Sequence, residues 1–365
     1  MRASVRIDLS ALQHNFEQIK KIVPTAYVMA MIKANAYGHS LLPVAQALSQ
    51  ADGFGVATID EAIALRQADI RQPLVVMSGF VDEAELRCMV DNQLTAVIHH
   101  SNQIQILQRT TLSSPFSVWL KIDTGMKRLG FLPEEASTAY QALLDHPQVR
   151  KPLVFMTHLA CSDQHNHPHT TKQIAQFHQT VASWPGLRSL ACSAAILDRP
   201  QTHADWVRPG ILLYGISPFS DKTGLMFGLK PVMTLTARLI SVKEARKGES
   251  IGYGDTWICP KDTKIGVVSI GYGDGYPRHA KSGTPVLINA ERCALIGRVS
   301  MDLITVDLEN QPHAKLGDTV VLWGQGLPVE EIAACAGTIG YELVCKITAR
   351  VPMCYSTTNV LSDNA

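Results

Sequence analysis

The sequence predicts an α/β protein, a (β/α)8 barrel followed by a C-terminal, mainly β domain. Eight short apolar runs alternate with segments of helical spacing between residues 25 and 215, and this alternation is typical of a parallel sheet with helical crossovers. After Lys230-Pro231 the apolar residues alternate with period two, as in antiparallel strands. The chain has 365 residues, more than one hydrophobic core usually holds, so we expect two domains.

The first part of the chain contains the eight predicted barrel strands. They are residues 27–32, 53–57, 74–77, 94–98, 117–122, 153–156, 187–192 and 207–213. Amphipathic helices are expected between them, for example at 41–48, 60–66 and 133–144. Eight strand–helix units fit a closed barrel. A doubly wound open sheet is the alternative, because periodicity does not show closure.

The second predicted domain is built from short strands. Runs at 233–240, 265–270, 285–288, 303–308 and 319–323 are bounded by Gly, Pro or Asp, and one helix is expected at 329–335. The boundary should fall at 227–232, where Gly228 and Pro231 interrupt the chain. We therefore predict a barrel at 10–228 and a mainly β domain at 229–365. An N-terminal strand within residues 1–9 could pair with either domain.

Composition and charge limit the classes of function. The hydrophobic share of 46% and charged share of 18% are those of an ordinary globular protein, and a net charge of +1 gives no basis for binding nucleic acid or a membrane surface. No apolar run approaches 18 residues, and the N-terminus lacks the apolar segment of a signal peptide, so we expect a cytoplasmic protein. The eight cysteines form no C-x-x-C pair, which predicts neither a disulfide framework nor a metal site.

Polar residues end the apolar runs of the predicted barrel, and the active site of such a barrel lies at the carboxyl ends of its strands. Lys33 ends the first run. An amine in apolar surroundings loses its charge more readily and can attack an aldehyde, although a lysine that only reaches solvent from a strand end is the alternative. The fifth to eighth runs give Lys121 with Asp123 and Arg128, His158, Ser193, and Arg208 with Gly210. This set indicates a phosphorylated aldehyde cofactor, pyridoxal 5'-phosphate.

Nine short motifs occur in order over almost the whole chain. They are KANAYGH at 33–39, KIDTGMKRLG at 121–130, TH at 157–158, CSAA at 192–195, VRPGILLYG at 207–215, IGYG at 251–254, GYGDGY at 271–276, GRVSMD at 297–302 and RVP at 350–352. In this order they resemble the motifs of bacterial alanine racemase. The resemblance implies a pyridoxal-phosphate barrel joined to a β domain. It also implies a head-to-tail homodimer, in which the barrel of one subunit and the β domain of the other share an active site.

The resemblance implies two catalytic bases. Lys33 would bind the cofactor as an imine and serve as the base on the D-alanine side, and Tyr253 from the second subunit would serve the L-alanine side. Two bases on opposite faces are what inversion at the α-carbon needs. Arg208 would face the pyridine nitrogen without protonating it, because guanidinium keeps its proton. His158 would hydrogen-bond Arg208.

The remaining implied contacts are with the cofactor and the substrate. Arg128 would contact the phenolic oxygen of the cofactor and the substrate carboxylate, and Lys121 would be carbamylated, as in many members of the family. The implied phosphate ligands are Tyr37, Ser193, Gly210 and Ile211, and the implied walls of the substrate pocket are Met301 and Tyr272. The implied substrates are L-alanine and D-alanine, the latter for bacterial peptidoglycan.

Three positions depart from the pattern of the family. Cys192 stands where many members have Asn, Ser300 where many have Cys, and Ala349 where some have a Tyr near the phosphate. None removes a proton-transfer group, so we expect effects on cofactor affinity and rate. The alternative functions are a racemase of another amino acid, an amino-acid decarboxylase with the same barrel, and a non-catalytic vitamin B6 carrier. The Gly-Tyr-Gly sequence at 252–254 argues against the decarboxylase, and the second domain argues against the carrier.

Overall fold

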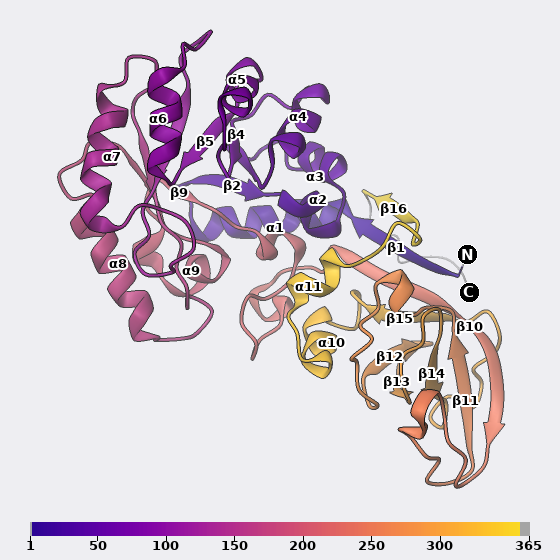
Figure 1. Ribbon diagram of the computed structural model, residues 1–365. Helices are drawn as coiled ribbons and strands as arrows, with labels where there is room; N and C mark the ends of the chain where they lie inside the picture. Colours follow the sequence, from indigo (N-terminus) through magenta and orange to yellow (C-terminus); the bar gives the residue numbers. More distant parts are fainter. Residues whose placement is uncertain (1, 358–365) are drawn as a thin grey trace. The chain divides into compact units, whose positions relative to one another are not determined.

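The computed structural model describes residues 2–357 and divides into two compact units (Figure 1). The barrel unit comprises residues 16–36 and 40–213, and the sheet unit comprises residues 2–15, 37–39 and 214–357. The domain limits predicted from the sequence, 10–228 and 229–365, stay a prediction. Residues 358–365 of the second predicted domain and residue 1 of the predicted N-terminal strand lie outside the described part. Within residues 2–357, no helix has the length and apolar character needed to cross a membrane.

Eight parallel strands form the sheet of the barrel unit, in the order β8-β7-β6-β5-β4-β3-β2-β9. Each overlaps one of the eight apolar runs of the sequence. Most of their residues are buried, as expected for strands that helices cover on the outer face. The strands are β2 (Tyr27–Met31), β3 (Gly53–Val56), β4 (Leu74–Val76), β5 (Thr95–Ile98), β6 (Ser117–Lys121), β7 (Val154–Met156), β8 (Leu187–Ser189) and β9 (Trp206–Val207).

The two edge strands, β8 and β9, come together and close the barrel. The N–H of Asp205 donates to the carbonyl of Arg188 at 3.2 Å, and the N–H of Arg208 donates to that of Ala191 at 2.9 Å. Cys192 and Arg208 form a further parallel bridge. The alternative prediction of an open, doubly wound sheet is therefore wrong.

The eighth strand is shorter than the sequence predicts. It ends at Val207, and Ile211–Tyr214 form the 3-10 helix η2. Pro209 has no N–H and cannot continue a ladder, while its carbonyl accepts from the N–H of Met31 at 2.9 Å. The prediction of a strand up to 213 is wrong for this reason.

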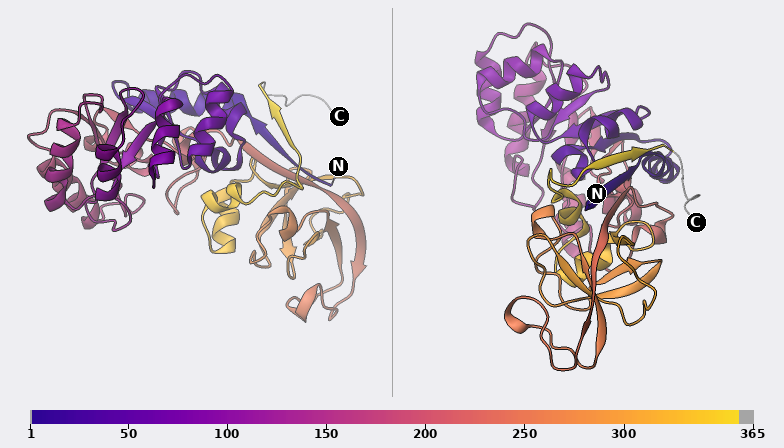
Figure 2. Two further views of the ribbon diagram at one scale, coloured as in Figure 1. Left: turned by 45° about the horizontal axis from the view of Figure 1, so that its top comes forward. Right: turned by 90° about the vertical axis from the view of Figure 1, so that its right-hand side faces the viewer.

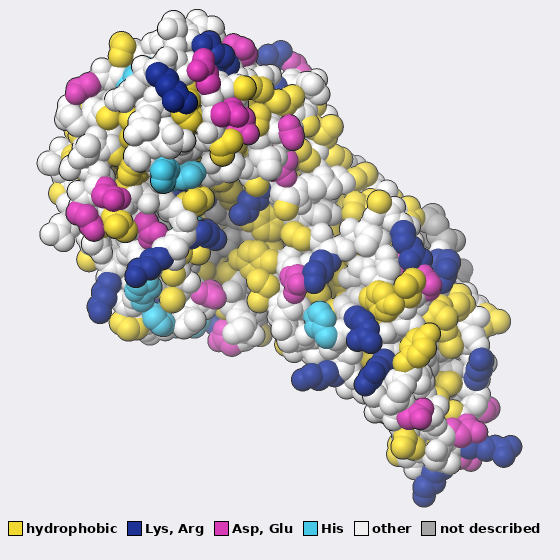
Figure 3. Space-filling view, in the orientation of Figure 1, with side chains coloured by type: hydrophobic (Ala, Val, Ile, Leu, Met, Phe, Trp, Pro, Cys, Tyr) yellow, Lys and Arg dark blue, Asp and Glu magenta, His cyan; other side chains and the backbone are white. Residues whose placement is uncertain are grey.

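Helices lie outside the barrel strands (Figure 1). Their N-termini carry recognisable signals: Thr58 and Asp82 accept hydrogen bonds from N–H groups of the first turn, and Pro133 and Pro168 occupy first positions. The helices are α3 (Leu41–Ala47), α4 (Ile59–Gln67), α5 (Glu83–Asp91), α6 (Ser101–Arg109), α7 (Pro133–Asp145), α8 (Pro168–Thr180) and α9 (Ser193–Asp198). The face of this unit shown in Figure 3 carries acidic and basic side chains interspersed.

The sheet unit is built around one long strand, β10 (Met233–Ala245), which pairs with β1, β15 and β11. Because β11 is also joined to β15 through β14, β13 and β12, these six strands form a closed ring. The other strands are β1 (Ala3–Asp8), β11 (Thr263–Val268), β12 (Pro285–Ile288), β13 (Glu291–Ile296), β14 (Ile304–Asp307), β15 (Thr319–Trp323) and β16 (Met353–Ser356). β1 lies between β10 and β16, so the N-terminal strand joins this unit (Figure 2).

Several elements were not predicted from the sequence. β13 follows β12 through the two-residue turn Asn289-Ala290, in which both residues have positive φ (52° and 65°), and the sequence lacks the glycine that usually marks such a hairpin. β16 is an edge strand with a partly exposed pattern. The helices α1 (Leu9–Ile22) and α11 (Gly340–Cys345) were also missed. The predicted helix at 329–335 is confirmed as α10 (Val329–Ala336).

Candidate active site

The segment after β2 is wound in the left-handed sense. α2 (Lys33–Gly38) has φ of 53–54° at each of residues 34–37, none of which is glycine. The N–H of Ala36 donates to the carbonyl of Ile32 at 2.8 Å. A left-handed conformation costs an L-residue roughly 1–2 kcal/mol, and such strain is characteristic of functional sites. The turn sets the direction in which the chain, and with it Lys33, leaves the strand.

Glu61 holds this turn in place. Its Oε1 accepts from the N–H of Asn35 at 3.1 Å, and its Oε2 accepts from the N–H of Ala57 at 2.8 Å. The side-chain oxygen of Asn35 accepts from the N–H of Leu41 at 2.8 Å. Glu61 could not be predicted from the sequence, because the Thr-x-x-Glu pattern at 58–61 signals a helix start and carries no information about the turn.

The strain in the turn predicts that Ala34→Gly stabilises the protein. Ala34 is exposed and has a φ of 54°, so glycine relieves strain without leaving a cavity. We expect a gain of about 1 kcal/mol in the free energy of unfolding, measured by urea denaturation. The matched control is Ala175→Gly in the exposed middle of the right-handed helix α8, which should cost about 1 kcal/mol. A loss of stability in both variants would contradict this account of the turn.

Four cationic side chains and a histidine occur at the carboxyl ends of the barrel strands. Lys33 follows β2, Lys121 ends β6 with Arg128 in the loop after it, His158 follows β7, and Arg208 follows β9. Lys121 and Arg208 are only 8% and 4% exposed. The positive charges of Lys33, Arg128 and Arg208 act on both Lys121 and His158. The structure thus brings these five predicted residues together.

Burial and positive charge shift the pKa values of this cluster. Burial first, and then the guanidinium groups of Arg128 and Arg208, lower the pKa of Lys121 to about 8. The same effects, with burial again the largest, hold the pKa of His158 well below its usual value. His158 is therefore neutral at pH 7, and a sizeable part of Lys121 is an unprotonated amine at slightly alkaline pH.

Asp123 is a carboxylate within this region, and its oxygens are already occupied. Burial raises its pKa, but hydrogen bonds from backbone N–H groups outweigh that effect and lower it. Oδ1 accepts from Gly125 at 2.9 Å and Lys127 at 3.0 Å, and Oδ2 accepts from Arg128 at 3.0 Å. Asp123 thus orders the loop that carries Arg128, and its negative charge offsets part of the effect of the cations on the pKa of Lys121.

The guanidinium of Arg208 is anchored inside the barrel. Nη1 donates to Ser189 Oγ at 2.6 Å, and Nη2 donates to the carbonyls of Thr157 at 2.7 Å and Leu190 at 3.2 Å. Burial lowers its pKa to about 10, so Arg208 stays a cation at neutral pH. The hydrogen bond predicted between His158 and Arg208 stays a prediction, and the positive charge of Arg208 lowers the pKa of His158.

Three predicted phosphate ligands lie side by side at this end of the barrel unit. Ser193 begins α9 and is buried, and its Oγ accepts from the N–H of Gly210 at 2.9 Å. Ile211 follows directly and begins η2. Tyr37 belongs to the sheet unit, where its ring stacks on that of Tyr214 with centroids 4.9 Å apart. The barrel unit therefore holds the Ser193 hydroxyl against the backbone N–H of Gly210.

Two more polar residues near the barrel site were not predicted. Gln173 of α8 is buried and donates to the carbonyl of His158 at 3.1 Å and to Thr124 Oγ1 at 3.3 Å. It was missed because it lies on a helix and not at a strand end. His99 directly follows β5, and its pKa is lowered, mainly by burial and in part by Lys121. Its place after the run at 94–98 was a signal that could have found it.

The predicted tyrosine base lies on an exposed loop of the sheet unit. Tyr253 begins the 3-10 turn η4 (Tyr253–Asp255) and is 70% exposed. Its neighbours Gly252 and Gly254 have φ of 77° and 70°. A Cβ atom on Gly254 would lie 3.2 Å from Arg298 Nη1, so the loop packs closely over that side chain.

The two predicted walls of the substrate pocket are also on the sheet unit, and the structure brings them together. Tyr272 begins η5 (Tyr272–Asp274), and its N–H donates to the carbonyl of Ser300 at 3.0 Å. The N–H of Gly273 donates to the carbonyl of Met301 at 2.8 Å. Tyr272 is 38% exposed and Met301 52%. Both side chains are therefore accessible at the surface of this unit.

Cys192 and Ala349, which depart from the pattern of the family, have different surroundings in the structure. Cys192 Sγ lies 3.1 Å from Ser162 Oγ and precedes Ser193 at the start of α9. Ala349 is exposed between Thr348 and Arg350. Ser300, the third departure, keeps a backbone role as the acceptor for Tyr272.

Comparison with known proteins covers nearly the whole chain. Residues 7–218 match the family described as alanine racemase, N-terminal domain, and residues 232–355 match the one described as alanine racemase, C-terminal domain. The chain is 53% identical over 355 residues to an alanine racemase of Coxiella burnetii (strain CbuG_Q212), covering 96% of this chain and 98% of the relative. It is 48% identical over 348 residues to one of Shewanella baltica (strain OS155), covering 95% and 97%. The crystal structure of biosynthetic alanine racemase from Pseudomonas aeruginosa superposes with a TM-score of 0.95, at 45% identity and covering 97% of this chain and 99% of that one.

Proposed function

Since the chain belongs to the alanine racemase family, we propose that it interconverts L-alanine and D-alanine with pyridoxal 5'-phosphate and two protein bases, Lys33 and Tyr253. The family makes it a racemase and thus an isomerase. The observation that carries the mechanism is the concentration of Lys33, Lys121, Arg128 and Arg208 at one end of the barrel unit. An anionic, phosphorylated ligand would neutralise this charge.

The residues of the barrel unit fit the cofactor group by group. Its aldehyde would bind the Lys33 amine, and its phosphate would bind the Ser193 hydroxyl and the N–H groups of Gly210 and Ile211, with Tyr37 as a further ligand. The N–H of Gly210 would then donate to the phosphate in place of Ser193 Oγ. Arg128 would bind the phenolic oxygen. When bound, the cofactor supplies an electron sink that makes the α-proton of alanine acidic.

Arg208 is suited to hold the pyridine nitrogen. Three of its five N–H donors bind Ser189, Thr157 and Leu190, and the other two remain for a ligand. With a pKa of about 10, the guanidinium would donate a hydrogen bond to the ring nitrogen and keep its own proton. The nitrogen would stay neutral, which restrains side reactions that need a stronger electron sink.

Lys33 and Tyr253 would act on opposite faces of the substrate. Lys33 would exchange a proton at the α-carbon on the D-alanine side, and Tyr253 would do so on the L-alanine side. We propose that Tyr253 comes from the second subunit of a homodimer, and its 70% exposure in the single chain supports this. Because a free phenol has a pKa of about 10, Tyr253 needs positive charge or hydrogen-bond donors near its oxygen.

Lys121 is the proposed site of carbamylation. The unprotonated amine would attack carbon dioxide and lose a proton, which leaves a carbamate anion beside Arg128. With a pKa of about 8, the reactive fraction rises from about one tenth at pH 7 to about nine tenths at pH 9. We expect a carbamate resonance in carbon-13 NMR after addition of labelled bicarbonate, stronger at pH 9 than at pH 7.

Two variants separate this site from other lysines. Lys121→Arg should lose the resonance, whereas Lys127→Arg, which changes an exposed lysine of the same loop, should keep it. The pKa of Lys121 when folded lies below the value of 10.5 for an ordinary lysine. The unmodified folded protein therefore binds fewer protons than the unfolded chain between pH 8 and 10.5, and its stability should rise with pH in this range. An equal signal in Lys121→Arg would contradict the assignment.

A panel of L-amino acids, assayed for the D-product, tests the function. We expect D-alanine from L-alanine and much less product from larger or basic amino acids. Release of carbon dioxide would indicate the decarboxylase, and the absence of any turnover would indicate the carrier. We further propose that the protein acts in the cytoplasm and supplies D-alanine for peptidoglycan, so that its deletion creates a requirement for D-alanine where no second racemase is present.

A further inference from the structure

Two loops of the sheet unit are joined backbone to backbone. One contains Tyr272 and the other contains Met301, and the hydrogen bonds from Tyr272 to Ser300 and from Gly273 to Met301 link them at 3.0 and 2.8 Å. A Cβ atom on Gly271 would lie 2.3 Å from the carbonyl oxygens of both Ser300 and Met301. Only glycine permits this approach, so the two loops form one structural piece.

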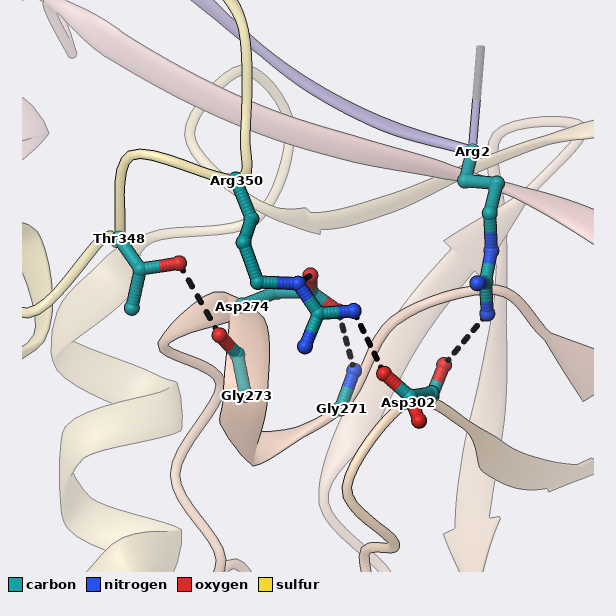
Figure 4. Close-up of polar contacts among 7 residues, drawn as sticks. All are labelled: Arg2, Gly271, Gly273, Asp274, Asp302, Thr348 and Arg350. Atoms are coloured by element: carbon teal, nitrogen blue, oxygen red, sulfur yellow. Dashed lines mark hydrogen bonds and ion pairs between the residues drawn. The ribbon is translucent and has the colours of Figure 1, made fainter.

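Arg350 bridges the two loops through their carboxylates. Its Nη2 donates to Asp302 Oδ1 at 2.6 Å, and its Nε lies 3.4 Å from Asp274 Oδ1 (Figure 4). Asp302 follows Met301 directly, and Asp274 lies two residues after Tyr272. The other oxygen of Asp274 accepts from the N–H of Gly271 at 3.0 Å, which fixes the carboxylate within its own loop.

The chain just before Arg350 is tied to the loop of Tyr272. Thr348 Oγ1 donates to the carbonyl of Gly273 at 3.0 Å, and the N–H of Thr348 donates to the carbonyl of Asp274 at 3.2 Å. The guanidinium packs over the loop so closely that a Cβ atom on Gly273 would lie 2.4 Å from its Nη1. Figure 4 shows the guanidinium of Arg350 between the two carboxylates.

The cluster of Arg350, Asp274 and Asp302 contributes more to the placement of the two loops than to the free energy of folding. The side chains of Arg350 and Asp302 are 47% and 41% exposed, and exposed ion pairs contribute little to the free energy of folding. Tyr272 and Met301 are themselves largely exposed, so burial in the single chain does not fix their side chains. Their placement depends on the loops beneath them.

We propose that Arg350 is a positioning residue, which with Asp274 and Asp302 fixes the loops of Tyr272 and Met301 and so sets the shape of the substrate pocket. The inference rests on the proposed function, in which these two side chains form the pocket walls. A small pocket rejects larger substrates only if its walls keep their place. Removing the bridge should therefore weaken substrate binding and selection, while the proton-transfer groups remain.

The test compares Arg350→Gln with Arg292→Gln in the holoenzyme. Arg292 makes an exposed ion pair with Glu331 elsewhere in the unit, so its loss is a matched control. For Arg350→Gln we expect KM for L-alanine to rise about ten-fold, with kcat within about three-fold, and the preference for L-alanine over L-serine to fall about ten-fold. Arg350→Lys should recover less than half of the change in KM, because one ammonium cannot bridge both carboxylates in the same geometry.

A second readout separates this inference from the proposed function. Carbon-13 labelling of methionine methyl groups reports the order of Met301 whether or not the protein racemises alanine. We expect the Met301 resonance to shift or broaden in Arg350→Gln and to stay unchanged in Arg292→Gln, with the cofactor band and the unfolding midpoint equal in both variants. An unchanged Met301 resonance, or equal changes in KM in the two variants, would overturn the inference.

Discussion

Lys33→Ala is expected to lose racemisation in both directions by at least about 10³-fold, because the residue is proposed as both the cofactor anchor and one of the two bases. The purified variant should also lack the absorption band of lysine-bound cofactor. Lys33 occupies the first position of α2, two residues after Met31, where the mostly buried strand β2 ends.

Two further measurements make this prediction strict. Lys127→Ala removes an exposed lysine of the loop after β6, and it should leave the band and the rate unchanged. Added methylamine should restore part of the band in Lys33→Ala, since a free amine can condense with the aldehyde. An intact band in Lys33→Ala without added amine would refute the role of Lys33.

The barrel could be predicted from sequence because its strands are short apolar runs that helices cover. Lys33, Lys121 and Arg208 could be collected for the same reason, since each lies within or directly after such a run. The closure of the barrel could not be predicted, because it depends on hydrogen bonds between residues far apart, such as Asp205 with Arg188. Periodicity reports how a strand is covered and says nothing of which strand lies beside it.

Supporting residues were missed for a related reason. Ser189 and Glu61 act through other residues, as the acceptors for Arg208 and Asn35, and neither position stands out in the sequence. The left-handed conformation of residues 34–37 could not be predicted either. Ala-Asn-Ala-Tyr is an ordinary sequence, and contacts with the surrounding structure hold its strained backbone in place.

The residues of the sheet unit came only from family resemblance. Tyr253, Tyr272 and Met301 lie in exposed loops, and no local pattern separates them from other surface residues. The structure gives a physical reason to group Tyr272 with Met301, since two backbone hydrogen bonds and the ion pairs of Arg350 hold their loops together. The role of Tyr253 is tested by measuring proton exchange.

Tyr253→Phe is expected to separate the two half-reactions. In deuterium oxide, exchange of the α-proton of L-alanine should fall by at least about 10³-fold, whereas exchange from D-alanine, assigned to Lys33, should stay within about ten-fold of the wild type. Racemisation should be lost in both directions, because each direction needs both bases. The change removes one oxygen from a side chain that is 70% exposed, so the fold should be unaffected.

Proton NMR of alanine, started separately from each enantiomer, measures both exchange rates. Tyr355→Phe, which alters another exposed tyrosine of the same unit, is the matched control and should exchange both enantiomers normally. Loss of exchange from both enantiomers in Tyr253→Phe would indicate that one base serves both faces, and normal exchange from L-alanine would remove Tyr253 from the mechanism. Since Lys33→Ala is expected to lose exchange from both sides, only the two-base mechanism predicts a difference between these variants that depends on the enantiomer.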